Sequence, residues 1–131
     1  MTGVTRSLTA VLVGGIVAAV LFQLGAVIAL LSFYGIPLGA SPTPPGPGYF
    51  ALNLGCSAVA AVVGGWVTAR VAADRPLAHA GAAAVLLGAL VLWGFAKPAS
   101  QWPSWYPPVL ALVGLAGLLV GAVLWRSRTP G

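Results

Sequence analysis

The sequence predicts an all-α membrane protein: a single domain over residues 1–131 that folds as a bundle of four transmembrane helices. Of the 131 residues, 60% are hydrophobic and only 5% are charged, whereas an average soluble domain carries roughly 25% charged residues. With a mean hydropathy of +1.02, the chain has too little polar surface to cover a soluble globule. Its apolar residues also fall into four stretches, each near or above the roughly 20 residues that a transmembrane helix needs. These observations exclude a cytosolic enzyme, a disordered chain and a disulfide-stapled secreted domain.

The first apolar stretch runs from about residue 8 to residue 34 and is interrupted only by Thr9, Gln23 and Ser32. It is much longer than the 7–15-residue core of a signal peptide, so we expect a transmembrane helix and not a cleaved leader. A proline-rich segment follows, from residue 35 to about residue 48. Prolines disfavour a helix, and we expect this segment to be an extended connector.

The second span is predicted at about residues 49–70, and a very short connection separates it from the third, at about 76–96. Pro76 stands where the first turn of a helix tolerates proline, and Asp74 is the expected N-cap of that helix. A connector rich in proline and aromatic residues leads to the fourth span, at about 108–125.

Basic residues gather on one side of the predicted spans. The positive-inside rule assigns the side with more lysine and arginine to the cytoplasm, which places both termini there. Tryptophan and tyrosine lie near the predicted span ends, where their rings favour the headgroup region. We therefore interpret the net charge of +5 as a determinant of membrane topology, and we expect no nucleic-acid partner. One side holds Arg6, Arg70, Arg75, Arg126 and Arg128, and the other holds Lys97.

Small residues recur at four-residue spacing on the predicted spans, which places them on one helix face and lets helix backbones approach closely. The strongest stripe lies on the second span, beside a parallel stripe of Cys56, Ala60, Gly64 and Thr68, and the fourth span carries a GxxxG motif. These faces suit packing within the bundle or contact with a second copy or another membrane protein. The candidate packing residues are Ser57, Ala61, Gly65, Ala69, Gly117 and Gly121.

Three polar residues fall inside predicted spans: Gln23, Asn53 and Ser57. An amide in hydrocarbon is costly unless it is hydrogen-bonded, so we expect Gln23 to face another helix. At 1.5 Å per residue, Gln23 lies roughly 16 Å and Ser57 roughly 12 Å from the outer boundary, depths that would let the two approach. These polar side chains are either interhelical hydrogen-bonding groups or the lining of a path for a polar solute.

Few residues can carry chemistry. The chain has one acidic residue, Asp74, one cysteine, Cys56, and one histidine, His79. Paired-carboxylate catalysis, a multi-histidine zinc site and a carboxylate ion site all need more ligands or acids than these. No predicted span carries a charged residue at mid-depth, as proton-coupled transporters usually require. We therefore expect no enzyme, no cofactor and no metal site.

Two function classes remain. The first is a non-catalytic accessory or scaffold protein in the lipid bilayer that acts through helix–helix contacts. The alternative is a small-solute transporter or channel that functions as an oligomer. Gln23, Asn53 and Ser57 would line a neutral path in the second case.

The stretch Gly64-Gly-Trp-Val-Thr-Ala-Arg70, the following Arg75-Pro-Leu-Ala-His79, and Trp105-Tyr106 before the last span resemble small four-span bacterial inner-membrane proteins of uncharacterised function. The resemblance covers roughly the last two thirds of the chain. It implies a four-helix architecture and a multi-pass location in the bacterial inner membrane, and it brings no activity or catalytic residue. The small multidrug transporters are similar only in architecture, because this first span lacks their functional glutamate.

Overall fold

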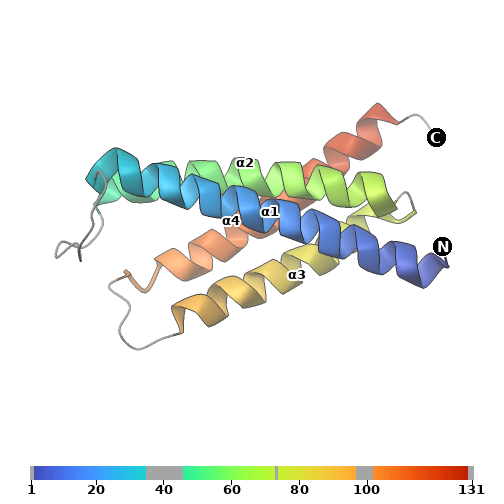
Figure 1. Cartoon of the computed structure of the whole chain (residues 1–131), viewed down its shortest axis with the longest axis horizontal. Helices are drawn as coiled ribbons and strands as arrows, with labels where there is room; N and C mark the ends of the chain where they lie inside the picture. Colours follow the sequence, from blue (N-terminus) through green and yellow to red (C-terminus); the bar gives the residue numbers. More distant parts are fainter. Residues whose placement is uncertain (1, 35–45, 73, 97–101, 130–131) are drawn as a thin grey trace.

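The computed structural model describes residues 2–34, 46–72, 74–96 and 102–129, and all regular elements in these ranges are helices. Each of the four is long and apolar enough to cross a membrane. This confirms the predicted all-helical fold with four candidate spans, and it indicates a multi-pass membrane protein. The helices, drawn in Figure 1, are α1 (Gly3–Tyr34), α2 (Pro47–Ala72), α3 (Pro76–Phe95) and α4 (Tyr106–Arg128).

Helices α1, α2 and α4 extend beyond the predicted apolar spans, because hydropathy marks only the part of a helix that suits hydrocarbon, whereas α3 matches its predicted span to within one residue. The backbone N–H of Thr5 donates to Oγ1 of Thr2 at 3.4 Å, which helps α1 begin at Gly3. Pro47 was expected in the connector but is the first residue of α2, a position where proline's missing N–H costs nothing. The rest of that connector, residues 35–45, and residues 97–101 of the second connector lie outside the described residues.

The turn between α2 and α3 differs from the prediction at its cap. Arg75, and not Asp74, is the N-cap of α3, with a left-handed backbone (φ 48°) and no side-chain capping bond. Its carbonyl instead accepts hydrogen bonds from the backbone N–H groups of Ala78 (3.0 Å) and His79 (3.3 Å). Pro76 has no N–H to satisfy, so the helix begins without a capping carboxylate.

Helices α2 and α3 each contact all three other helices, and α2 is the centre of the bundle because its contacts with α1 and α4 are the more extensive. Helix α4 packs on α2 and α3, and α1 packs on α2 and α3, whereas the described parts of α1 and α4 make no contact. Figure 1 shows the N-terminus, the α2–α3 turn and the C-terminus at one end of the bundle. At the opposite end, α1 and α3 lie well apart.

The α2–α4 interface brings two backbones into contact through glycines. A Cβ added at Gly65 would overlap the backbone oxygen of Leu118, and one at Gly121 would overlap the backbone oxygen of Val62. A Cβ at Gly117 would stand 2.5 Å from the Cβ of Ala61. Because lipid tails are as apolar as the helices, such close packing is a main source of helix association in a membrane.

The neighbouring stripe of α2 packs on α1. A Cβ added at Gly64 would lie 2.5 Å from the Cβ of Ala18, and one at Gly14 would overlap Oγ1 of Thr68. That hydroxyl is fully buried and donates to the Gly64 carbonyl at 2.8 Å. Each small-residue stripe of α2 therefore faces a different helix of the same chain.

A glycine-to-alanine change should have opposite effects at two positions of α2. We expect Gly65→Ala to lower the free energy of unfolding by about 1–3 kcal/mol, because the added methyl group meets the α4 backbone and overpacks the interface. Gly55 is exposed, with nothing within 4 Å of an added Cβ, so Gly55→Ala should stabilise the helix by about 0.5–1 kcal/mol. Unfolding in detergent measures both. Equal effects of the two variants would contradict the close α2–α4 contact.

Candidate functional site

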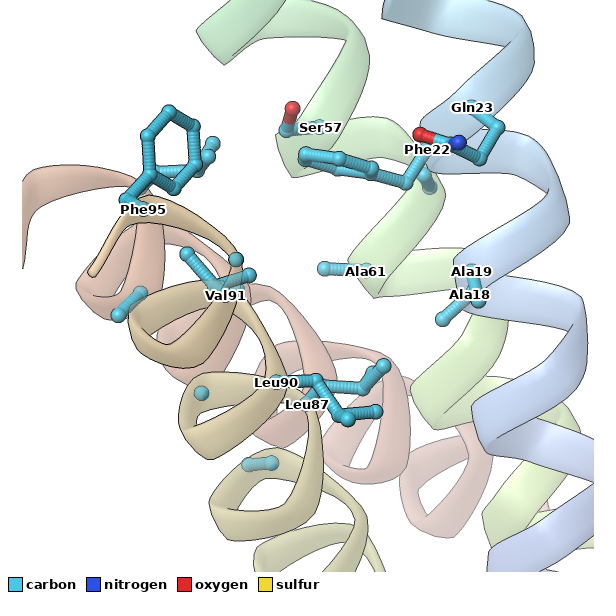
Figure 2. A pocket seen from close by; sticks show the side chains of 17 residues that line it. Ala18, Ala19, Phe22, Gln23, Ser57, Ala61, Leu87, Leu90, Val91 and Phe95 are labelled. Atoms are coloured by element: carbon cyan, nitrogen blue, oxygen red, sulfur yellow. The ribbon is translucent and has the colours of Figure 1, made fainter. Parts of the chain in front are cut away.

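A cavity of about 480 Å³ lies among the four helices and is open on one side. Helices α1 and α3 form its two flanks, and α2 and α4 close it from behind (Figure 2). It occupies the half of the bundle in which α1 and α3 diverge, and we call it the α1–α3 cavity. Its lining includes Ala18, Phe22 and Gln23 of α1, Ser57 and Ala61 of α2, Leu87, Gly88, Val91, Gly94 and Phe95 of α3, and Leu110 and Gly114 of α4.

The lining is apolar apart from two side chains, Gln23 and Ser57, and it includes no charged residue. Ser57 is buried, and its hydroxyl donates to the carbonyl of Asn53 at 2.6 Å. Gln23 is exposed at the rim and makes no hydrogen bond within the described part of the chain. Gln23 and Ser57 thus line the same cavity, but no hydrogen bond joins them. Figure 2 shows the ring of Phe22 reaching from α1 toward Ser57.

Asn53 lies outside the cavity lining and joins two helices. It is 3% exposed, and its Nδ2 donates to the hydroxyl oxygen of Tyr106 at the start of α4. Its Oδ1 is buried without a hydrogen-bond partner. Asn53 was predicted to lie inside a span, whereas Tyr106 was expected only at a span boundary. The sequence feature that could have predicted this hydrogen bond is an amide in one span together with a phenol near the end of another.

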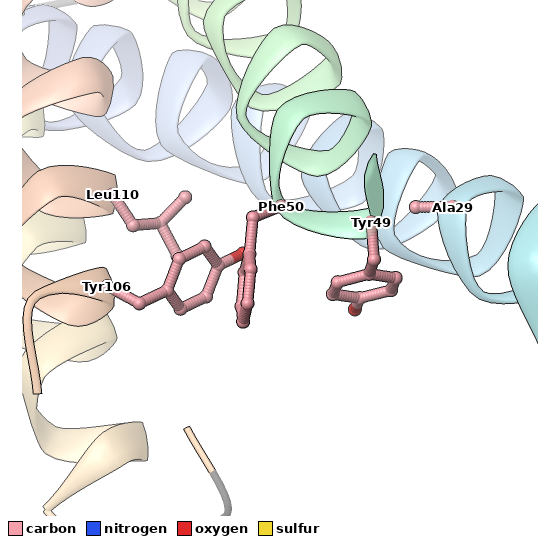
Figure 3. Packing of buried hydrophobic residues seen from close by; sticks show 5 residues of the cluster. All are labelled: Ala29, Tyr49, Phe50, Tyr106 and Leu110. Atoms are coloured by element: carbon pink, nitrogen blue, oxygen red, sulfur yellow. The ribbon is translucent and has the colours of Figure 1, made fainter. Parts of the chain in front are cut away.

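An aromatic cluster closes the end of the cavity near the start of α4. Neighbouring ring centroids within it lie 4.7–6.1 Å apart, the spacing of edge-to-face and offset-stacked pairs. Phe95 lines the cavity and packs at 5.6 Å from Trp102 and 5.7 Å from Tyr106. Figure 3 shows three members beside Ala29 and Leu110. The cluster comprises Tyr49, Phe50, Phe95, Trp102, Trp105 and Tyr106.

The aromatic residues thus divide into two groups. Tyr49 and Tyr106, both expected to anchor in the headgroup region, are buried between helices, at 5% and 0% exposure. Trp93 and Trp105 are exposed, at 80% and 49%. The sequence pattern marks the span ends but does not separate a lipid-facing ring from one that packs inside the bundle.

At the opposite end of the bundle lie the described charged residues. The guanidinium of Arg70 stands 5.4 Å from the ring centroid of Trp66, which packs edge-to-face on Trp125 at 5.7 Å. Nε of Arg6 donates to the carbonyl of Val71 at 3.1 Å. In the ranges that the structure covers, no three His, Cys, Asp or Glu side chains come together in a way that would hold a metal ion.

The candidate packing residues are turned into the bundle. Ala61 packs with Ala84 and Leu118, and Ala69 packs with Ala80 and Ala122. Ser57 and Ala61 also form part of the cavity wall. The stripe therefore has two roles within one chain: its glycine meets α4, and its end near Ser57 borders empty space.

Comparison of the chain with known protein families, with curated proteins and with solved structures finds no match. Any function assigned to the chain therefore rests on its own residues and on the geometry described above.

The Asn53–Tyr106 pair predicts a non-additive double mutant. Tyr106→Phe should lower the free energy of unfolding by about 1–3 kcal/mol, because it leaves a buried amide without any partner. Asn53→Leu combined with Tyr106→Phe should recover most of that loss, since removing both partners leaves no unpaired group. Unfolding in detergent gives the two values. Purely additive effects would contradict the hydrogen bond.

Proposed function

We propose that the chain is a non-catalytic accessory or scaffold protein of a bacterial inner membrane that acts through contacts made inside the bilayer. The observation that carries the proposal is the distribution of charge. The described charged side chains lie at one end of the bundle, and none lines the cavity. General acid–base catalysis needs a titratable group within hydrogen-bond reach of a substrate, and proton-coupled transport needs an ionisable group at depth.

The outward face of α1 is the surface that we propose for helix–helix contact. The two stripes of α2 are covered by α1 and α4 of the same chain, so they offer no surface to a partner. Helix α1 is the longest of the four and makes no contact with α4. Its outward side chains are large and apolar, and they include Leu12, Ile16, Val20, Leu24 and Val27, each at least half exposed.

The second candidate, a small-solute transporter or channel, is favoured by the presence of a cavity. The mostly apolar lining of the cavity does not favour a polar solute. Ser57 already uses its hydroxyl inside α2, which leaves Gln23 as the polar group that faces open space. The aromatic cluster also fills the end of the bundle toward which a path would have to lead.

We propose that both termini lie in the cytoplasm. The two ends of the described chain and the α2–α3 turn share one end of the bundle (Figure 1). That end carries five of the six basic residues of the sequence, and such a concentration marks the cytoplasmic side.

Two serines at opposite ends of α4 provide a matched test of this orientation. Ser104 and Ser127 are both exposed. In a Cys56→Ala background, which removes the one native cysteine, a membrane-impermeant maleimide on intact cells should label Ser104→Cys and leave Ser127→Cys unlabelled until the cells are permeabilised. The reverse pattern would mean that the termini face the periplasm.

The contact role predicts position-specific cross-linking. With a photoreactive residue at Val20, we expect adducts with a membrane protein or with a second copy of the chain. The same residue at Val85 of α3, which is 72% exposed, should give little adduct. Absence of adducts at Ile16, Val20 and Val27, together with solute flux through the purified protein in liposomes, would favour the transporter instead.

A further inference from the structure

We propose that the α1–α3 cavity is a binding site for one uncharged, lipid-soluble molecule: a hydrocarbon chain that carries a hydroxyl, carbonyl or ester group. The polar group would lie at Gln23 and the hydrocarbon between Phe22 and Phe95. This inference goes beyond the proposed accessory role and does not depend on it.

The first observation is the open space above three glycines. An added Cβ at Gly88, Gly94 or Gly114 would have no atom within 4 Å, although all three residues line the cavity. This differs from Gly65 and Gly117, whose missing side chains make room for another helix. Glycine weakens a helix relative to alanine, and these three glycines have no packing contact in return. They border a cavity of about 480 Å³. Small-molecule sites typically occupy roughly 300–1,000 Å³.

The second observation is the position of the opening. Gln23 at the rim lies 11 residues before the end of α1 at Tyr34, a distance of about 16 Å at 1.5 Å per residue. The opening therefore faces the hydrocarbon of a bilayer whose core is about 30 Å thick. A molecule that enters there comes from the lipid phase. Since the lining holds no charged side chain, a charged group would be left unpaired at that depth, and the occupant is uncharged.

The third observation is the unpartnered amide of Gln23. A glutamine side chain offers two donors and an acceptor, and none of them is used within the described part of the chain. In hydrocarbon an unsatisfied amide is unfavourable. Ser57, the other polar residue of the lining, already donates to the Asn53 carbonyl. Gln23 is thus the group that would distinguish a hydroxyl- or carbonyl-bearing molecule from a plain hydrocarbon tail.

The shape of the cavity suits a chain. Figure 2 shows the rings of Phe22 and Phe95 on opposite flanks, with Val91 on the α3 side and Ala61 behind. Aromatic rings on two sides and small residues at the back form a slot for a narrow apolar body. Tyr106 and Trp102 pack against Phe95 and close one end.

The test uses the full chain in phosphatidylcholine vesicles and two photoreactive probes of equal length: a diazirine-bearing hexadecanol and the corresponding alkane. We expect both to label residues of the cavity wall, in α1 near Phe22 and in α3 near Val91. The alcohol should label about threefold more strongly, the preference that one intramembrane hydrogen bond of about 0.6 kcal/mol gives. At an alkaline pH that ionises its carboxyl group in the bilayer, a matching diazirine fatty acid should label the wall no better than the alkane.

Three variants divide the proposal into its parts. Gln23→Leu should abolish the preference for the alcohol and keep the alkane labelling. Gly88→Leu and, independently, Gly114→Leu should weaken labelling by both probes, because the new side chain occupies part of the cavity. Gly55→Leu is the matched control, since Gly55 faces open space on α2 and does not line the cavity, and it should leave labelling unchanged. Helical content and gel-filtration behaviour equal to wild type show that each variant is folded.

Several results would overturn the proposal. Equal labelling by alcohol and alkane in the wild type would remove the role of Gln23. Labelling spread evenly over the outward face of α1, unchanged in the Gly88→Leu and Gly114→Leu variants, would mean that the probes react from the bulk lipid and not from a binding site. A cavity wall protected from both probes, with cross-links to another chain at Gln23, would show that a protein helix covers it instead.

Discussion

The structure depends on the close approach of other backbones to α2. Hydrophobic burial does not hold helices together in lipid, so association relies on packing, and packing at backbone distance requires small residues. Helix α2 carries two such stripes, offset by one residue and therefore about 100° apart around its axis. One meets α1 at Gly64 and the other meets α4 at Gly65. Since α1 and α4 do not touch each other, they are joined through α2 and α3, and the more extensive contacts with both are those of α2.

The cavity follows from the same geometry. Two helices held on adjacent faces of a third leave a wedge between them, and α3 fills this wedge only where it runs close to α1. Toward the other end α3 diverges from α1 (Figure 1). There Gly88 and Gly114 leave space open between the larger side chains that line it. Phe95 and its aromatic neighbours then close the end of the bundle, so the opening remains at the side.

The polar residues inside the spans show how packing assigns different tasks to similar groups. Asn53 and Gln23 both carry amides at hydrocarbon depth. Asn53 faces α4 and donates to the Tyr106 hydroxyl, which links two helices at the closed end. Gln23 stands at the rim of the cavity without a partner in the described chain. An amide that is already paired contributes to the fold, whereas an unpaired one remains available to a molecule from outside the chain.

The sequence by itself determined the number and kind of spans, because the thickness of hydrocarbon demands about 20 apolar residues per helix. Four-residue spacing also made the small stripes of α2 visible, but it did not reveal their counterpart on α1, at Gly14, Ala18 and Gly25. Only the tertiary structure decided which stripe meets which helix, and it placed Gln23 at the cavity rim without a hydrogen bond to Ser57. Depth along a span can be counted from the sequence, but rotation about the helix axis is fixed by packing. With Ala18 turned toward α2, five residues at about 100° each carry Gln23 about 140° around α1, to the exposed rim of the cavity.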